Sequence, residues 1–278
     1  MILHPPRDDS PLTGLVDVLW YFDTSADPAS PAHRRGKEKV LPTGTFEFVF
    51  NLGDDRIHVY ERGNAERPLE LSGAITCGVH SEYFMLDRER RGRVAGVHFK
   101  PGGAYPLLRR SAADFANRHV DLVEILGPAV TAFRRDLAQL TAPQRLFGAL
   151  ETFLTEKLDR RRRLSAAVAG ALRMLDENPF CNPVPALQSE FEITQKGLIG
   201  AFKRQVGLTP KTFSRVLRFQ EVLKRIVNGR NPDWADIALR CGYYDQAHFG
   251  RDFKRFSGFS PGEYRARAGP NPNHVSAT

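Results

Sequence analysis

The chain has 278 residues, of which 41% are hydrophobic and 26% are charged, and its formal net charge at pH 7 is +8. This length accommodates two domains of ordinary size, and the composition is that of a soluble protein. The sequence opens without a basic segment followed by an apolar run, and nowhere does it approach the roughly 18 consecutive apolar residues of a membrane span. We therefore expect a cytoplasmic protein with no signal peptide and no membrane contact.

Short strands are predicted throughout the first 100 residues. Turn residues separate segments of strand-forming character at 14–22, 45–52, 56–60, 69–75, 82–87 and 93–100. In the second segment Phe46, Phe48 and Phe50 alternate on one face. The proline-containing stretch 27–42 is predicted to be a loop. A series of short strands of this kind indicates a barrel or a sandwich.

From residue 121 onward the apolar residues recur at helical spacing. Helices are predicted at 123–126, 130–140 and 144–158. Four consecutive arginines at 160–163 then interrupt the pattern. Such a run is typical of a solvated linker or of a helix start, and contact with DNA phosphates is the alternative interpretation. A further amphipathic helix is predicted at 164–175.

The basic charge is concentrated after these helices. From Arg160 onward there are 20 Lys and Arg against 10 Asp and Glu, whereas residues 1–159 hold 20 against 22. The C-terminal part therefore has a charge balance of +10 and the N-terminal part a balance of −2. A basic module beside a near-neutral one is what phosphate binding by one domain requires, although a solvated basic surface would give the same asymmetry.

One stretch of sequence occurs twice within the basic part. The residues Phe202, Lys203, Gly207, Pro210 and Phe213 recur as Phe253, Lys254, Gly258, Pro261 and Tyr264, each displaced by 51 positions. Upstream of this stretch the displacement is 50, so one copy has a turn that is one residue longer. Repetition of this kind indicates one supersecondary unit that is used twice.

The second copy has the pattern of a helix-turn-helix. Pro232 suits a first helical position, and the apolar residues from Trp234 onward keep helical spacing. Gly242 is predicted to form a left-handed C-terminal cap and Asp245 to cap the next helix, which ends at Gly258. A helix, a short turn and a second helix in this order define the motif.

The first copy repeats this pattern. Pro185 lies near the start, Thr194 is the predicted cap, and the second helix ends at Gly207. Leu198 and Phe202 are predicted to point inward. Between the copies, residues 213–227 have apolar positions at three- and four-residue steps and predict one connecting helix, which stops at residues 228–229.

Two segments of the sequence resemble known families. WADIALRCGYYDQAHFGRDFKRFSGFSPGEYR, residues 234–265, resembles the second helix-turn-helix of the AraC/XylS family of bacterial transcription regulators. FVFNLGD, residues 48–54, followed by GVHFKPGGAYPLL, residues 96–108, is similar to the cupin-like N-terminal domains of some of these regulators.

These resemblances imply an α+β chain of two domains. Residues 1–158 would form a β-rich cupin-like barrel with helices, which acts in sensing or dimerisation. Residues 164–268 would form an all-α double helix-turn-helix domain. Residues 269–278 are predicted to be a disordered tail.

The family resemblance also implies a function. We expect a sequence-specific DNA-binding transcription regulator whose two motifs read successive major grooves, with double-stranded DNA as its partner. RNA polymerase, a small-molecule effector and a second copy of the chain in a homodimer are candidate partners. No cofactor is implied.

An enzyme is the alternative class, either a cupin-type metalloenzyme or a DNA-modification protein with a helical DNA-targeting domain. His58, His80 and His98 lie in predicted strands, but no His-x-His pair or Glu at a ligand-like interval accompanies them. The three cysteines are scattered, and the sequence contains no G-x-x-x-x-G-K or G-x-S-x-G motif. We therefore expect no catalytic residue and no metal site.

The second helix of the second unit is expected to read bases. The resemblance places Gln246, Ala247 and Arg251 at base-facing positions, where Arg can bridge guanine O6 and N7 and Gln can pair with adenine. His248 at this position more often packs or contacts the DNA backbone than reads a base. Gly250 and Lys254 complete the predicted DNA-facing set of this helix.

The first unit is expected to read sequence more weakly. Its predicted DNA-facing residues are Gln195, Lys196, Ile199 and Lys203. The family usually has Arg at the position of Gly200, and Gly197 and Gly200 inside the helix each cost about 1 kcal/mol relative to Ala. Gln188 replaces the small residue that stands at Ala238 in the second unit, which puts close packing of the first helix pair in doubt. We expect this unit to keep affinity and to lose part of its specificity.

Overall fold

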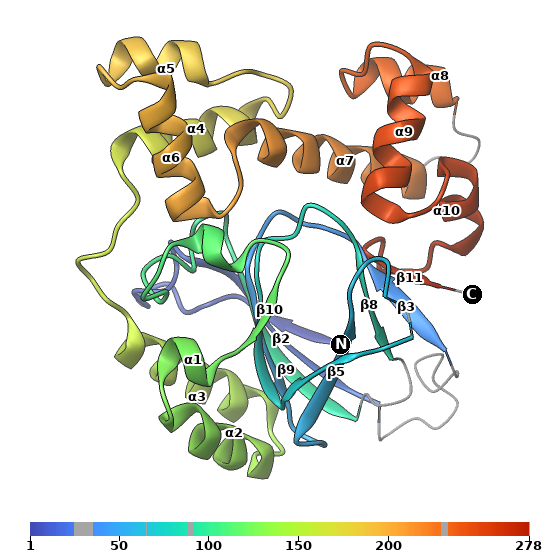
Figure 1. The fold of residues 1–278 in the computed structure, drawn as a ribbon. Coiled ribbons are helices and arrows are strands. Elements are labelled where there is room, and N and C mark those ends of the chain that lie inside the picture. The colour runs from blue at the N-terminus through green and yellow to red at the C-terminus, as the bar shows by residue number, and fades with distance from the viewer. Residues whose placement is uncertain (25–35, 65, 88–91, 229–232, 278) are drawn as a thin grey trace.

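The computed structural model describes residues 1–24, 36–64, 66–87, 92–228 and 233–277 of the chain. Strands are the main regular elements of the chain up to residue 121, and helices occupy most of the remainder (Figure 1). The chain is thus α+β with a β-rich N-terminal half and a helical C-terminal half, as the sequence predicted. None of the helices that the structure describes combines the length and the apolar character required of a membrane span.

The β-rich half contains two antiparallel sheets. The six-stranded sheet has the order β1 (Ile2–His4), β2 (Val16–Asp23), β9 (Arg93–Phe99), β4 (Glu47–Asn51), β7 (Ala74–Cys77) and β10 (His119–Asp121). The five-stranded sheet has the order β11 (His274–Ser276), β3 (Lys37–Val40), β8 (Phe84–Asp87), β5 (Arg56–Tyr60) and β6 (Leu69–Ser72).

The two sheets face each other across a small apolar cluster. Ile75 of β7 packs there with Val59 of β5 and Phe84 of β8. The opposite face of the six-stranded sheet directs Phe48 and Phe50 into a second, larger core. Because successive side chains of a strand point to opposite faces, one sheet serves both cores, and the alternation predicted for β4 is confirmed.

Two predictions for this half are wrong in part. The segment predicted at 69–75 is two strands, β6 and β7, which separate at Gly73. There an added Cβ would lie 2.9 Å from the backbone oxygen of Asp54, so the chain has no room for a side chain. The stretch predicted as the loop 27–42 contains strand β3. Its alternating charges gave no apolar signal, and its pairing partners are distant in sequence. Residues 25–35 of that stretch lie outside the described residues.

The prediction of a disordered tail over residues 269–278 is also wrong. Residues His274–Ser276 form β11, which pairs antiparallel with β3 at the edge of the five-stranded sheet. Val275 is fully buried in this position. The tail is short and polar, and only its partner strand, far away in the sequence, gives it a structure.

Helices cover the outer face of the six-stranded sheet. These are the 3-10 helix η2 (Ala112–Phe115), α1 (Val123–Leu126), α2 (Ala129–Gln139) and α3 (Pro143–Lys157). The predicted helical stripe of α3 is buried, including Leu146, Leu150 and Leu154. In Figure 1 α1, α2 and α3 form one layer on the side of the β half that faces away from the remaining helices.

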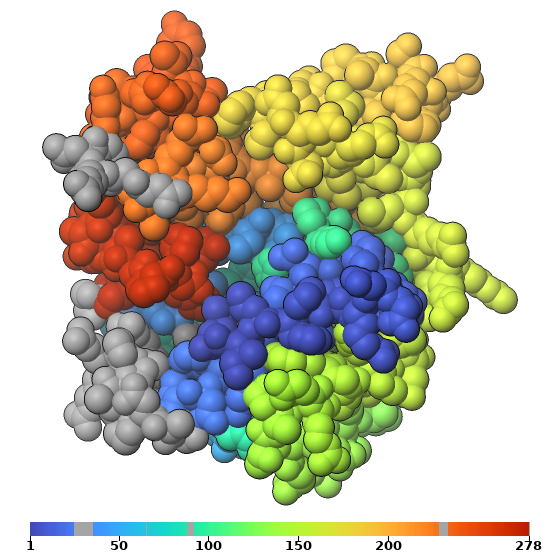
Figure 2. Space-filling model, turned by 180° about the vertical axis from the view of Figure 1, so that it is seen from behind, coloured from blue at the N-terminus to red at the C-terminus, as the bar shows by residue number. Residues whose placement is uncertain are grey.

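The C-terminal half consists of seven helices within the described residues. They are α4 (Ala166–Glu177), α5 (Val184–Glu190), α6 (Gln195–Val206), α7 (Pro210–Asn228), α8 (Trp234–Arg240), α9 (Gln246–Ser257) and α10 (Pro261–Arg267). In Figure 1 α7 is a long connecting helix, with α4, α5 and α6 at one end and α8, α9 and α10 at the other. In the space-filling view of Figure 2 the two ends form separate lobes above the β half, with a notch between their outer tips.

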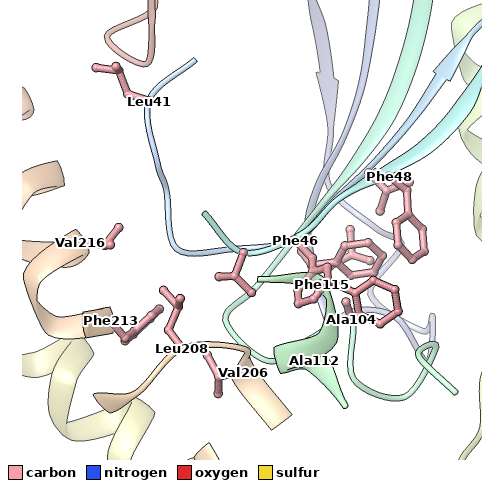
Figure 3. Close-up of a cluster of buried hydrophobic side chains, with 14 of the residues drawn as sticks. Leu41, Phe46, Phe48, Ala104, Ala112, Phe115, Val206, Leu208, Phe213 and Val216 are labelled. Carbon is pink, nitrogen blue, oxygen red and sulfur yellow. The ribbon is translucent and has the colours of Figure 1, made fainter. Parts of the chain in front are cut away.

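One apolar core runs through both halves. Figure 3 shows its buried residues at the junction, Val206, Leu208, Phe213 and Val216 from the helical half and Leu41, Phe46, Ala112 and Phe115 from the β half. At Gly44 the backbone approaches α7 so closely that an added Cβ would lie 3.1 Å from the ring of Phe213. The β-rich half and the helical half are therefore packed against each other without a break in the apolar core. A division into separately folding domains near residues 158–164 stays a prediction.

Candidate nucleic-acid interface

The first helix-turn-helix unit is formed by α5 and α6. The hydroxyl of Thr194 accepts a 3.1 Å hydrogen bond from the backbone N–H of Gly197 and so satisfies a free donor at the start of α6. Gly207 ends the helix at φ 105°, in the left-handed region that glycine adopts without steric cost. Leu198 and Phe202 are buried beneath the helix. The predicted cap, end and inward positions are confirmed.

The second unit is formed by α8 and α9 and uses the same devices. The carboxylate of Asp245 accepts a 2.6 Å hydrogen bond from the N–H of His248 at the start of α9. Gly242 in the turn has φ 67°, and Gly258 ends α9 at φ 71°. The inward residues of α9 are Phe249, Phe253 and Phe256. These predictions too are confirmed.

The start of α8 differs in detail from the prediction. Asp233 is the N-cap residue, and its carboxylate accepts a 2.9 Å hydrogen bond from the N–H of Ala235. Pro232, which was predicted at the first helical position, lies outside the described residues. The sequence signal was therefore close to the helix start, and the cap itself was not identified.

The connecting helix α7 extends beyond the prediction of 213–227 at both ends. Most of its predicted stripe is buried, and Phe219 adds a ring that lies 5.3 Å from the ring of Phe253 in α9. Val227, which has the spacing of this stripe, is 46% exposed. The helix thus packs against both units along most of its length.

An ion pair that sequence reasoning missed joins α7 to α9. Arg215 donates from Nη2 to Asp252 Oδ1 over 2.6 Å and from Nε to Asp252 Oδ2 over 3.2 Å. Asp252 is only 6% exposed, and a two-point contact of this kind holds an arginine in one orientation. A second arginine, Arg218, donates from Nη1 to the carbonyl of Gly242 over 3.0 Å and so fixes the turn of the second unit. A charged residue at an inward position of α9 was the available signal for this pair.

Eight of the ten predicted DNA-facing residues form equivalent pairs on the two reading helices α6 and α9, and the other two, Arg251 and His248, correspond to glycines of α6. Those that are exposed are Gln195, Lys196, Lys203, Gln246, Ala247, Arg251 and Lys254. Those that are partly buried are Ile199, His248 and Gly250. Both helices have their C-terminal ends against the β half and their N-terminal ends directed away from it (Figure 1). Because the N-terminal residues of such a helix contact base edges, this orientation leaves the reading ends accessible.

Three positions of this surface have different surroundings. The ring of His248 packs edge-on against Tyr243 at 5.4 Å, which agrees with a packing role. Gly200 faces open space, since no heavy atom would lie within 4 Å of an added Cβ. Gln188 is partly buried, whereas its counterpart Ala238 is almost fully buried, so the longer side chain stays partly in solvent.

Two exposed apolar residues of the second unit were not predicted. Tyr244, in the turn directly before α9, is 93% exposed, and Leu239 on α8 is 74% exposed. The neighbouring Tyr243 is buried, and burial raises the pKa of its hydroxyl. That hydroxyl has no hydrogen-bond partner among the described residues. The sequence could not assign opposite environments to two adjacent tyrosines.

The three histidines that the sequence analysis placed in strands do not gather at one site. His58 lies near Glu70, His80 is buried with Nδ1 2.9 Å from the carbonyl of Gly78, and His98 contacts Thr45 Oγ1 at 3.0 Å. Across the residues that the structure describes, no group of three His, Cys, Asp or Glu side chains is placed to hold a metal ion.

Comparison with protein families matches two segments of the chain. Residues 187–267 match a helix-turn-helix domain, and residues 4–121 match a domain of unknown function, DUF6597. The first match runs from within α5 to the end of α10, and the second runs from the last residue of β1 to the end of β10.

Curated relatives match part of the chain. The HTH-type transcriptional regulator MtrA of Neisseria gonorrhoeae is 38% identical over 73 residues, which are 26% of this chain and 24% of that protein. The HTH-type transcriptional activator RhaS of Escherichia coli is 29% identical over 133 residues, 47% of this chain and 48% of that protein. The chain thus spans between a quarter and a half of the length of these relatives.

Solved structures match as well. A probable AraC family transcriptional regulator from Rhodopseudomonas palustris is 29% identical, with 38% of this chain and 100% of that chain covered and a TM-score of 0.34. ToxT from Vibrio cholerae is 11% identical over 89% of this chain and 96% of that chain, with a TM-score of 0.46. The chain thus combines a helix-turn-helix domain at residues 187–267, whose second motif resembles that of AraC-family regulators, with a DUF6597 domain at residues 4–121.

Proposed function

We propose that this chain is a sequence-specific transcription regulator that binds double-stranded DNA with α6 and α9 in successive major grooves. The observation that carries the proposal is the placement of these two helices. They stand at opposite ends of α7, and both direct their N-terminal ends away from the β half (Figure 1). Seven of the ten predicted contact residues are exposed there, on the part of the chain that has the +10 charge balance.

The two helices would contribute differently to binding. On α9, Arg251 and Gln246 are exposed and supply the donors and acceptors that read guanine and adenine edges. On α6, Lys196 and Lys203 supply positive charge for phosphates, and Ile199 can cover a thymine methyl group. Affinity would therefore come from both units and base preference chiefly from the second.

The proposal is tested by selecting duplexes that bind the full chain from random DNA and by footprinting the selected sequence. We expect two protected major grooves about one helical turn, roughly 34 Å, apart. We also expect log K to fall linearly with log [salt], because a basic surface that contacts several phosphates releases counterions. A single protected groove or a flat salt dependence would contradict the proposal.

For the β half, residues 1–158, we propose a role in sensing a small-molecule effector or in forming a homodimer. The support is its size and its continuous packing against the DNA-binding half. Sedimentation of the chain with and without selected DNA measures dimerisation, and the DNA-bound chain has RNA polymerase as a further candidate partner. A chain that stays monomeric and whose DNA binding ignores every small molecule offered would argue against this role.

A further inference from the structure

The last residues of the chain return to the β half after α10. Within β11 and β3 the two strands run antiparallel, and two further backbone hydrogen bonds extend the ladder. The N–H of Leu41 donates to the carbonyl of Asn273 over 2.9 Å, and the N–H of Ala277 donates to the carbonyl of Lys37 over 2.9 Å. We call residues 269–277 the strap. A strand added to a sheet edge gains affinity from its main-chain hydrogen bonds, whatever its side chains are.

The strap also has specific side-chain contacts at both of its ends. On the side of α10, the buried hydroxyl of Tyr264 donates to the carbonyl of Pro272 over 2.8 Å. On the side of β3, His274 Nδ1 lies 2.6 Å from Oε1 of Glu38, whose side chain is almost fully buried. Between them Val275 is fully buried. The strap therefore connects the second helix-turn-helix unit to the sheet edge through packing as well as through hydrogen bonds.

A residue of α7 contacts both the strap and the segment that follows β3. The side-chain amide of Gln220 donates to the carbonyl of Pro42, just beyond β3, over 2.7 Å and lies 2.8 Å from Oδ1 of Asn273 in the strap. One amide group of the connecting helix thus contacts both the β half and the strap. The position of the strap depends on all three.

The end of α9 makes polar contacts with the same sheet edge. The ammonium of Lys39 on β3 donates to the carbonyl of Gly258 over 3.3 Å and lies 3.7 Å from the centre of the Phe259 ring. Arg62 donates to the carbonyl of Arg255 over 3.2 Å. Cations at the C-terminal end of a helix are favourable, but contacts of this kind near solvent contribute only modestly.

The end of α6 contacts the β half in a different manner. An added Cβ at Gly207 would lie only 2.4 Å from Cγ2 of Val79. Val206, Val79 and Ala112 are all buried at this contact. Gly207 and Gly258 are equivalent positions of the repeat, so the β half contacts both reading helices at the same point. The contact at Gly207 is apolar, whereas at Gly258 an added Cβ would lie 2.6 Å from both the Lys39 ammonium and the Tyr83 ring, and the strap adds its own contacts beside this one.

We propose that the strap sets the half-site spacing that the two reading helices accept, an inference that rests on the proposed function. α7 joins the units on one side and the β half joins them on the other, so the contacts form a closed ring. A closed ring of contacts resists relative movement of the units more than α7 alone. Opening the ring at the strap, its polar side, releases the second unit from the sheet edge and leaves the first unit docked.

The experiment uses the duplex selected with the full chain and a set of duplexes with one or two base pairs inserted between the half-sites. For the full chain, one inserted base pair should lower affinity about tenfold, because it shifts and rotates one half-site relative to the other. A chain that ends at Gly269 should lose about threefold or less on the same insertion. Val275→Asp, which places a charge at the buried centre of the strap, should behave as the truncated chain does.

Two controls separate a strap effect from general damage. Val227→Asp makes the same substitution at an exposed valine of α7 and should keep the full spacing preference. Glu38→Cys with Ser276→Cys joins facing positions of β3 and β11, which are not a directly hydrogen-bonded pair and so lie close enough for a disulfide. Oxidised, this variant should keep the spacing preference of the full chain.

The outcomes distinguish this inference from the proposed function. If the full chain binds its selected duplex but the truncated chain shows the same loss on insertion, the strap does not set spacing and the inference is overturned. The inference is also overturned if the Val227→Asp control loses its preference as Val275→Asp does. If the full chain selects no duplex at all, the proposed function itself fails.

Discussion

The first reading helix, α6, and the second, α9, occupy equivalent places in the repeat and end in the same left-handed glycine, yet their surroundings differ. α6 buries Leu198 and Phe202, and the amide of Gln205 meets Ser165 before α4, accepting a 2.8 Å hydrogen bond from its N–H. α9 buries three phenylalanines and has an ion pair to α7 where the first unit has Ala201. The helix-turn-helix shape is thus encoded by caps and turns, whereas each unit is anchored by contacts of its own.

The shape of the motif and the anchoring of each unit therefore depend on different residues. The caps and glycines determine that two helices meet across a turn, and they are alike in both copies. The anchoring contacts determine how firmly each unit is held, and the exposed side chains determine what it reads. We infer that the second unit is the one more strongly anchored to α7 and the more selective one. The predictions below test that asymmetry, in order of decreasing effect.

The ion pair provides the largest test. Arg215→Leu should leave the Asp252 carboxylate buried without its partner and lower the free energy of unfolding by about 3 kcal/mol. Urea denaturation of the full chain measures the change. Adding Asp252→Ala to the Arg215→Leu variant should restore part of the loss, because it removes the unpaired charge. A loss below about 1 kcal/mol for Arg215→Leu would mean that the second unit is not anchored in this way.

Base reading provides the second test. Arg251→Ala should lower the free energy of binding to the selected duplex by about 1–3 kcal/mol and relax base preference in one half-site. Lys203→Ala, on the first unit, should weaken binding to all sequences about equally and reduce the salt dependence, as the loss of a phosphate contact does. Both are measured on a library of half-site variants. If Lys203→Ala alters base preference and Arg251→Ala does not, the roles of the two helices are reversed.

One substitution in the first unit is expected to raise both the stability of the chain and its base preference. Gly200 faces open space, so Gly200→Arg should raise the free energy of unfolding by about 1 kcal/mol through helix propensity and add a preference for guanine in the first half-site. Gly197→Ala is the matched control, because an added Cβ there would lie 3.1 Å from the capping hydroxyl of Thr194 and the propensity gain would be offset. Equal gains at both positions would show that the surroundings of these glycines do not matter.

Sequence reasoning identified the elements that depend on local signals. Thr194, Asp245, Gly207 and Gly258 act within a few residues of their own positions, and each lies where the spacing predicted. The same holds for the apolar stripes of α3 and α7. The helices of the C-terminal half, with their caps and turns, could therefore be predicted from the sequence.

Contacts between distant segments could not be read in the same way. Strand β11 exists because it pairs with β3, and the contact of His274 with Glu38 spans 236 positions. The partner of Asp252 depends on how α7 and α9 pack, which neither helix specifies alone. The exposed residues of the reading helices were predicted as a set, but which of them contact DNA remains to be tested.

The helices that follow the two reading helices begin in different ways. At the start of α10, Ser260 Oγ accepts a hydrogen bond from the N–H of Glu263 over 3.3 Å, and the Glu263 carboxylate accepts one from the N–H of Ser260 over 2.6 Å. This is a capping box. At the equivalent start of α7 the residues are Thr209 and Thr212. The N–H of Thr212 donates to Thr209 Oγ1 over 3.1 Å and the two hydroxyls lie 2.9 Å apart, but neither residue has a carboxylate to complete a capping box.

The capping box should make the second unit more sensitive to acid than the first. The hydrogen bond from the Ser260 N–H holds the pKa of Glu263 below its ordinary value of 4.5. A carboxylate with a lowered native pKa contributes stability above its unfolded pKa and loses that contribution as the pH falls through the native value. Unfolding followed from pH 7 to acid should therefore show a small stability difference between the native chain and Glu263→Ala at neutral pH. The difference should shrink as the pH falls below 4.5 and disappear below the native pKa of Glu263. Thr212→Glu should install the same box in the first unit and raise stability by about 0.5 kcal/mol at neutral pH, with the same decline in acid. If Glu263→Ala and the native chain keep a constant difference at all pH values, the contribution of Glu263 is packing and not its charged hydrogen bond.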